Sequence, residues 1–174
     1  HKTMRRKSGE PYILHPLAVA RICVEEIGLG VRSTICALLH DTVEDTDITL
    51  EDVEREFGNE ITRIVDGLTK ISNVIDVNAS QQAENFKKIL LTLTDDPRVI
   101  LIKLSDRLHN MRTLDSMKRE KQLKISSETV YVYAPLAHRM GLYNIKTELE
   151  DLAMKYMEPD AYKEIARKLS ETRR

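Results

Sequence analysis

The chain has 174 residues, 41% of them hydrophobic and 32% charged, a composition typical of one soluble globular domain with a real core. Its net charge of −1 gives no overall positive field, which argues against a general attraction to nucleic acid or to a membrane surface. The longest apolar run, VILIKL, is far too short to span a bilayer.

Helical patterns follow one another through the first half of the chain. Pro16 suits the first turn of a helix that runs through AVARICVEEI, and Gly28 ends it. A second helix is predicted over residues 32–45 and contains the apolar stretch ICALLH. Thr49 can cap the following helix in a variant capping box, and Gly58 stops it.

The second half shows the same helical character. Residues 61–71 have helical spacing, with Ile61, Ile64, Val65 and Leu68 on one side, whereas 72–80 lacks a clear period and is predicted to be a loop. Further helices are predicted from Ser80, from Pro97, over 117–139 with a bend at Pro135, and in two amphipathic stretches, NIKTELEDLAMKYM and DAYKEIARKLS. Strand signals are almost absent. The sequence therefore predicts an all-α fold in a single domain, residues 1–174.

The two cysteines and the chain end bear on context. Cys23 and Cys36 have no CxxC spacing and lie in apolar helical patterns, so buried reduced thiols and a cytoplasmic location are expected. The final residues, KLSETRR, stop inside a helical pattern, which predicts a piece of a longer protein.

The predicted helix 32–45 carries a dense group of chemically active side chains. His40 and Glu44 would share a face at i, i+4, and so would Asp41 and Asp45. This spacing predicts adjacent His and Asp metal ligands with two carboxylates one turn further on. Each pair alone is more often a surface pair or a solvated helix end, and only their joint occurrence favours a metal site.

A polar stripe interrupts the apolar helix that follows Pro97. Asp106, Asn110 and Thr113 recur at i, i+4 and i+7, and polar groups on a buried helix need partners, which a metal ion with a bound phosphate would supply. His15 stands at the start of the first helix, where the backbone can aim its ring inward. Asp106 alone also fits a buried acid paired with Arg107 or Arg112.

The mixed nitrogen and oxygen ligand set suits Mn²⁺, Fe²⁺ or Zn²⁺, and no cysteine-rich motif suggests a structural zinc site. With four protein ligands, an octahedral ion keeps two positions for water and substrate oxygen. Such an ion lowers the pKa of its water and polarises a phosphoryl oxygen. These features predict a metal-dependent phosphohydrolase.

Basic residues precede the first predicted ligand. Arg5, Arg6 and Lys7 lead into a turn-rich segment before His15, where they can meet phosphates or stack on a purine, although an exposed charged terminus is the simpler interpretation. Three more basic side chains can reach the same pocket: Lys103, Arg107 and Arg112. The remaining histidines are interpreted as structural or as supporting the ligands: His1, His109 and His138.

Four motifs in order make the chain recognisable: RRKSGEPYILHP, ALLHDTVEDT, ILIKLSDRLHNMRTL and YAPLAHRMGLYNIKTELEDLAMKY. Together they resemble the hydrolase domain of the RelA/SpoT family, whose enzymes make and degrade guanosine tetra- and pentaphosphate, (p)ppGpp. The resemblance covers essentially the whole chain and is closest to the long, two-activity members, in which a synthetase domain follows. It implies an all-helical HD-type fold that binds one Mn²⁺.

The resemblance also implies a role for each site residue. It makes His15, His40, Asp41 and Asp106 the Mn²⁺ ligands, and Glu44 and Asp45 the acids that activate water. It implies that Arg6 and Lys7 bind the guanine base and that Ser8 and Tyr12 shape the wall of the base-binding site. It also implies that Asn110 and Thr113 contact the sugar or the phosphates. The reaction implied is release of pyrophosphate from the 3′ position of (p)ppGpp, leaving GDP or GTP.

Members that have lost hydrolysis lack an intact HDxxED segment, and here it is complete as HDTVED. Thr3 and Met4 stand where many relatives carry a Gly-Gln pair. Two alternatives stay open: a module that senses (p)ppGpp without hydrolysing it, and a phosphohydrolase for another nucleotide such as NADPH. A DNA-binding helical domain fits poorly because no helix carries a continuous basic stripe.

Overall fold

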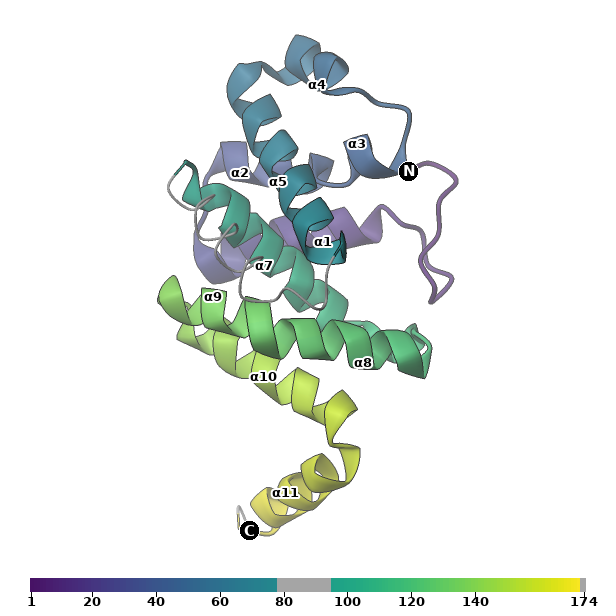
Figure 1. Ribbon diagram of the computed structural model, residues 1–174, viewed down its shortest axis with the longest axis vertical. Helices are drawn as coiled ribbons and strands as arrows, with labels where there is room; N and C mark the ends of the chain where they lie inside the picture. The colour runs from purple at the N-terminus through teal and green to yellow at the C-terminus, as the bar shows by residue number, and fades with distance from the viewer. Residues whose placement is uncertain (78–94, 173–174) are drawn as a thin grey trace. The chain divides into compact units, whose positions relative to one another are not determined.

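The computed structural model describes residues 1–77 and 95–172, and it separates into two compact units, His1–His109 and Asn110–Arg174 (Figure 1). The helix predicted from Ser80, and the last residues of the predicted loop 72–80, lie outside the described residues. Within the described part every regular element is a helix, and the one β-contact is an isolated bridge between Arg5 and Pro11. The predicted all-α fold is confirmed.

The first unit consists of helices joined by short turns. Its elements in chain order are α1 (Leu14–Arg21), a π-helix (Ile22–Ile27), α2 (Val31–Leu39), α3 (Thr42–Asp45), α4 (Leu50–Phe57), α5 (Asn59–Val77) and the start of α7 (Pro97–Arg112).

The expected helix boundaries are mostly confirmed. Pro16 lies in the first turn of α1, and Gly28 ends the π-helix with φ +83°, a left-handed conformation that glycine adopts without steric cost. Thr49 and Asp52 form the predicted capping box of α4, in which each side chain accepts a hydrogen bond from the other residue's backbone N–H. Local capping chemistry therefore sets these boundaries, as the sequence indicates.

Two predictions in this unit were wrong. The helix expected over 32–45 ends at Leu39, the chain turns at His40 and Asp41, and α3 begins at Thr42. His40 and Glu44 therefore do not share a helix face, although Asp41 and Asp45 still lie one turn apart, because the Asp45 N–H donates to the Asp41 carbonyl at 2.9 Å. The loop expected from Ser72 is helical up to Val77, as the last part of α5.

The core of the first unit lies between α1, α2, α5 and α7. The residues expected on the inner side of α5 are all buried: Ile61, Ile64, Val65 and Leu68. Helices α5 and α7 approach closely at Gly67, where a Cβ atom would lie 3.0 Å from a methyl group of Val99. The apolar first half of α7 is also buried, at Val99, Ile100, Ile102 and Leu104. α7 therefore reaches the site from inside the core.

The second unit continues from α7 with a 3-10 turn (Leu114–Ser116), α8 (Arg119–Glu128), a π-helix (Thr129–Tyr133), α9 (Ala134–Arg139), α10 (Tyr143–Met157) and α11 (Pro159–Thr172). The predicted segment 117–139 is thus helical but contains a π-turn just before Pro135. α10 packs beside α8 and α9, and α11 leads away from the end of α10 (Figure 1).

Both cysteines are free thiols and fully buried, as expected. None of the described helices is long and apolar enough to cross a membrane. The cytoplasmic location stays a prediction.

Candidate metal centre

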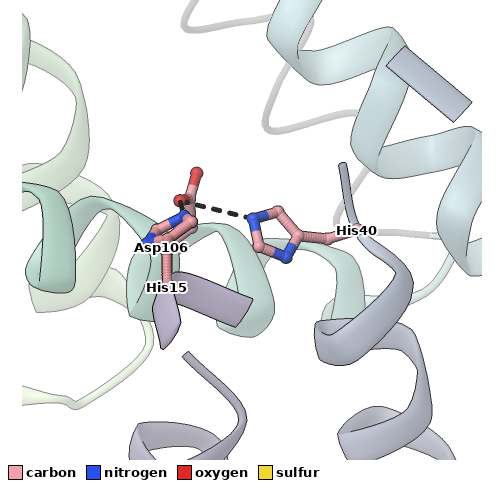
Figure 2. Close-up of side chains that lie close together, drawn as sticks. All are labelled: His15, His40 and Asp106. Carbon is pink, nitrogen blue, oxygen red and sulfur yellow. Dashed lines mark ion pairs between the residues drawn. The ribbon is translucent and has the colours of Figure 1, made fainter. Parts of the chain in front are cut away.

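Three buried side chains from distant parts of the chain meet in the first unit. His15 comes from the first turn of α1, His40 from the turn after α2, and Asp106 from the middle of α7 (Figure 2). Their ligand atoms all lie within 4.8 Å of one another. Asp106 Oδ1 is 2.9 Å from His15 Nε2 and 3.5 Å from His40 Nε2, so one carboxylate faces both rings.

Asp41 adds a fourth candidate ligand at the edge of this cluster. Its Oδ2 atom lies 2.9 Å from His40 Nε2 and 3.8 Å from His15 Nε2. The side chain is 16% exposed, so the centre opens toward solvent on the side of Asp41 and α3. The structure thus brings together all four residues expected to hold the metal.

The His40 ring shows which of its nitrogens serves the centre. Nδ1 lies 2.6 Å from the carbonyl oxygen of Ala37, which can only accept a hydrogen bond, so Nδ1 carries the proton. Nε2 is buried and makes no hydrogen bond of acceptable geometry, although two carboxylates surround it. A ring nitrogen between two carboxylates needs a positive charge beside it, which a proton on Nε2 supplies without metal and a divalent cation supplies when bound, so this atom fits a metal ligand.

The charges around the centre lead to the same conclusion. Burial opposes a charge on His40, but the carboxylates of Asp106 and Asp41 outweigh it and raise the pKa of the imidazole to about 10. Burial likewise opposes ionisation of Asp106, yet Lys103 and the two histidines hold the pKa of that carboxyl well below its usual range. The centre therefore favours a positive charge in its middle.

Lys103 and Ser72 extend the centre on the side of Asp106. Lys103 Nζ lies 3.0 Å from Asp106 Oδ2 and donates to Ser72 Oγ at 2.9 Å. Lys103 was expected to reach this pocket, whereas Ser72 was missed because its segment lacked a clear helical period. Arg112 pairs with Glu148 at 2.6 Å inside the second unit, and the alternative pairing of Asp106 with Arg107 or Arg112 stays a prediction.

The two candidate catalytic acids lie beside the centre on α3. Glu44 and Asp45 are both exposed, whereas His15, His40 and Asp106 are buried. Partial burial is the main cause of a raised pKa in both carboxyls, and the negative charge of Asp41 adds to it. An acid with a raised pKa next to a water-accessible metal site is suited to take a proton.

Tyr12 was expected to shape the base-binding wall, but its hydroxyl faces the carboxylates. The hydroxyl donates to Asp41 Oδ2 in a short hydrogen bond and lies 3.3 Å from Asp45 Oδ2. Burial and the nearby carboxylates raise the pKa of this phenol far above its usual value, so it stays a donor. Tyr12 therefore ties a candidate metal ligand to a candidate catalytic acid.

The basic approach forms a tight turn before α1. The Arg6 N–H donates to the Glu10 carbonyl at 3.0 Å, and Gly9 follows in a left-handed conformation with φ +89°. Lys7 and Ser8 are exposed at the tip of this turn, while Arg6 is half-buried and lies 3.0 Å from His109.

Asn110 and Thr113 fall in the second unit, Asn110 at the end of α7 and Thr113 just after it. Their expected contact with the nucleotide stays a prediction.

An all-helical fold with a buried histidine–aspartate centre and a neighbouring acidic pair defines a class of helical domains whose centre could hold a divalent cation. The model of the HD domain family matches residues 1–143. The chain belongs to the HD domain family.

The relatives sharpen this assignment. The chain is 48% identical, over its whole length, to a guanosine-3′,5′-bis(diphosphate) 3′-pyrophosphohydrolase of Aquifex aeolicus, of which it covers 25%. It is 51% identical, over 98% of its length, to a GTP pyrophosphokinase of Streptomyces coelicolor, of which it covers 20%. The chain thus spans a quarter or less of these relatives, and the resemblance to the RelA/SpoT family is confirmed.

A solved structure resembles the fold as well. It belongs to a metazoan ortholog of SpoT, described as hydrolysing ppGpp, and superposes with a TM-score of 0.65 at 26% identity, covering 90% of this chain and 89% of that one. The HD-type helical fold is therefore shown by sequence and by structure.

Proposed function

We propose that this chain is a (p)ppGpp 3′-pyrophosphohydrolase domain that works with one divalent cation, Mn²⁺. The observation that carries the proposal is the pairing of a buried centre, in which His15, His40 and Asp106 converge, with two exposed acids beside it. The names of the relatives support the substrate, since one is called a guanosine-3′,5′-bis(diphosphate) 3′-pyrophosphohydrolase and a structural neighbour is described as hydrolysing ppGpp.

The name GTP pyrophosphokinase describes a relative of which this chain matches only a fifth. A synthetic activity would then belong to the parts of that protein that have no counterpart here. A full-length protein of this kind would carry the synthetase as a further domain, and the part that matches this chain would be the hydrolase.

In the proposed mechanism, His15, His40, Asp41 and Asp106 hold the cation. When bound, Mn²⁺ would lower the pKa of water and stabilise negative charge on phosphoryl oxygen. Glu44 or Asp45 takes a proton from the water that attacks the phosphorus next to the ribose 3′ oxygen. A new oxygen–phosphorus bond forms, the bond to the 3′ oxygen breaks, pyrophosphate leaves, and the 3′ oxygen takes a proton to give GDP or GTP.

The nucleotide would be recognised by the basic turn before α1. The Arg6 guanidinium can stack on a purine and donate to its acceptors, and Lys7 and Ser8 are exposed at the tip of the turn. Asn110 and Thr113 would contact the sugar or phosphates. Tyr12 would shape the wall of the base site with Ser8, and its hydroxyl also contacts the carboxylates of Asp41 and Asp45.

The deciding experiment measures pyrophosphate release from ppGpp with and without Mn²⁺. The wild-type chain should turn over only with the cation, and His40→Ala should abolish turnover. Glu44→Gln and Asp45→Asn should keep cation binding and lower turnover by about 10²–10⁴-fold in at least one case. Full activity in both variants would refute these roles.

The same assay separates the alternatives. Binding of ppGpp without pyrophosphate release would indicate a sensing module. Faster phosphate release from NADPH than pyrophosphate release from ppGpp would indicate a different nucleotide substrate. Either result would replace the proposed function.

A further inference from the structure

We propose that His109 is a positioning residue: it fixes the His15 ring so that the Nε2 lone pair of His15 faces the metal centre, with Arg6 determining the direction of the hydrogen bond. His109 is outside the ligand set described above. The inference rests on the proposed function only for the role of the cation, and it can be tested without any nucleotide.

The rings of His15 and His109 are in close contact. Their Nδ1 atoms lie 2.7 Å apart, so one of them must donate a hydrogen bond to the other. The ring centroids are 4.9 Å apart and the ring planes differ by 30°. Distance alone leaves open which nitrogen carries the proton.

Arg6 determines the direction of this hydrogen bond. Its Nη1 atom lies 3.0 Å from His109 Nδ1, and a guanidinium can only donate. His109 Nδ1 is therefore the acceptor, and the proton lies on His15 Nδ1. His15 Nε2 then carries the lone pair, and it is this atom that lies 2.9 Å from Asp106 Oδ1.

His109 reaches this position because of its place on α7. It follows Asp106 by three residues, which puts the two side chains on neighbouring positions of one helix face. One helix therefore supplies both a candidate ligand and the group that orients the ligand opposite it. His109 Nδ1 faces His15 and Arg6, and this is why we assign it to orientation and leave it out of the ligands.

The two candidate histidine ligands are thus oriented in parallel ways but by different groups. His40 donates from Nδ1 to the backbone carbonyl of Ala37, whereas His15 donates to a side chain. Acceptors of this kind hold the ring and raise its basicity, and their loss typically weakens metal binding by about 10–100-fold. Only the His15 acceptor can be removed by mutation.

The test measures binding of Zn²⁺ and of Mn²⁺ to the purified chain by calorimetry. His109→Leu removes the acceptor and should weaken binding by about 10–100-fold. His109→Gln restores a carbonyl acceptor and should recover affinity to within about threefold. His138→Leu makes the same substitution at a histidine of the second unit and should bind as the wild type does.

Variants of Arg6 provide a second test of the proposal. Because it acts through His109, Arg6→Ala should weaken binding less than His109→Leu, and the double variant should bind no worse than His109→Leu alone. Nitrogen NMR of the imidazoles supplies a readout independent of affinity: in the zinc-loaded wild type, His15 should carry its proton on Nδ1.

Unchanged metal affinity in His109→Leu would overturn the proposal, and so would additive losses in the double variant. A proton on His15 Nε2 in the wild type would also refute it, even if His109→Leu fails to fold. Loss of affinity that His109→Gln does not recover would assign His109 to packing. Absence of ppGpp hydrolysis by the wild type would refute the proposed function and leave these measurements valid.

Discussion

Lys103 Nζ lies 3.0 Å from Asp106 Oδ2, one turn away on the same helix, and the Lys103 side chain is 16% exposed. The other carboxylate oxygen of Asp106 faces the two histidines, at 2.9 Å and 3.5 Å from their Nε2 atoms. The lysine therefore neutralises this buried carboxylate from behind, while the histidine side is left for a cation.

Lys103→Met should lower the free energy of unfolding by about 1–3 kcal/mol when the protein is kept with a chelator, because the charge of Asp106 loses a buried partner. With Zn²⁺ bound the loss should be smaller, since the cation takes over part of that role. Urea unfolding under both conditions measures the difference. Lys70→Met, at an exposed lysine paired with Asp66, is the matched control and should cost about 0–1 kcal/mol. An equal loss with and without Zn²⁺ would contradict the proposed neutralisation.

Tyr12→Phe removes the hydroxyl that joins Asp41 to Asp45. Metal affinity should fall by about tenfold because Asp41 loses the hydrogen bond that orients it. Turnover at saturating metal should fall as well, since Asp45 loses the same anchor. Tyr131→Phe, at an exposed tyrosine of the second unit, should change neither quantity. If Tyr12→Phe matched the wild type in calorimetry and in turnover, the hydroxyl would have no orienting role.

Gly67→Ala tests the close approach of α5 and α7. Alanine favours a helix by about 1 kcal/mol over glycine, but here its Cβ would lie 3.0 Å from a methyl group of Val99. We expect a net loss of stability in the wild-type background and a gain in a Val99→Ala background, where the methyl groups are absent. A double-mutant cycle from thermal unfolding measures this coupling. Stabilisation by Gly67→Ala in both backgrounds would show that α5 and α7 can accommodate the added Cβ atom without a steric clash.

The two cysteines should be inert in the folded protein. Both are fully buried, and burial raises the pKa of the Cys36 thiol to about 12 and that of the Cys23 thiol above its usual value. A thiol reagent at pH 8 should therefore modify neither, because only the thiolate reacts. Both should react as denaturant unfolds the chain, and the denaturant concentration at half-reaction should equal the unfolding midpoint measured by circular dichroism. Rapid modification of the native protein would place one of them in an open region.

The sequence predicted those parts of the fold that depend on local signals. Pro16, Gly28, Thr49 and Gly58 act through their own backbone geometry or capping groups, so their effect is visible in the chain. The turn at His40 was missed because the apolar stretch before it runs on into residues that are also compatible with a helix.

The site shows the same division. The residue types at His15, His40 and Asp106 indicated a metal centre, and their convergence is set by packing between α1, α2 and α7. Which nitrogen of a ring faces inward depends on a backbone carbonyl for one histidine and on a second histidine for the other. Such contacts join residues far apart in the sequence, and no spacing rule reports them.

The turn that separates α2 from α3 determines which mutations the metal centre can tolerate. In a regular helix, neighbouring residues point about 100° apart, so the side chains of an adjacent His and Asp do not face each other. Here both residues lie in the turn after α2, and His40 Nε2 comes within 2.9 Å of Asp41 Oδ2. The backbone conformation of the dipeptide itself therefore brings the His40 and Asp41 side chains together. Substitutions along α2 can repack the core while the dipeptide keeps its aim, but a single residue inserted between His40 and Asp41 would separate them.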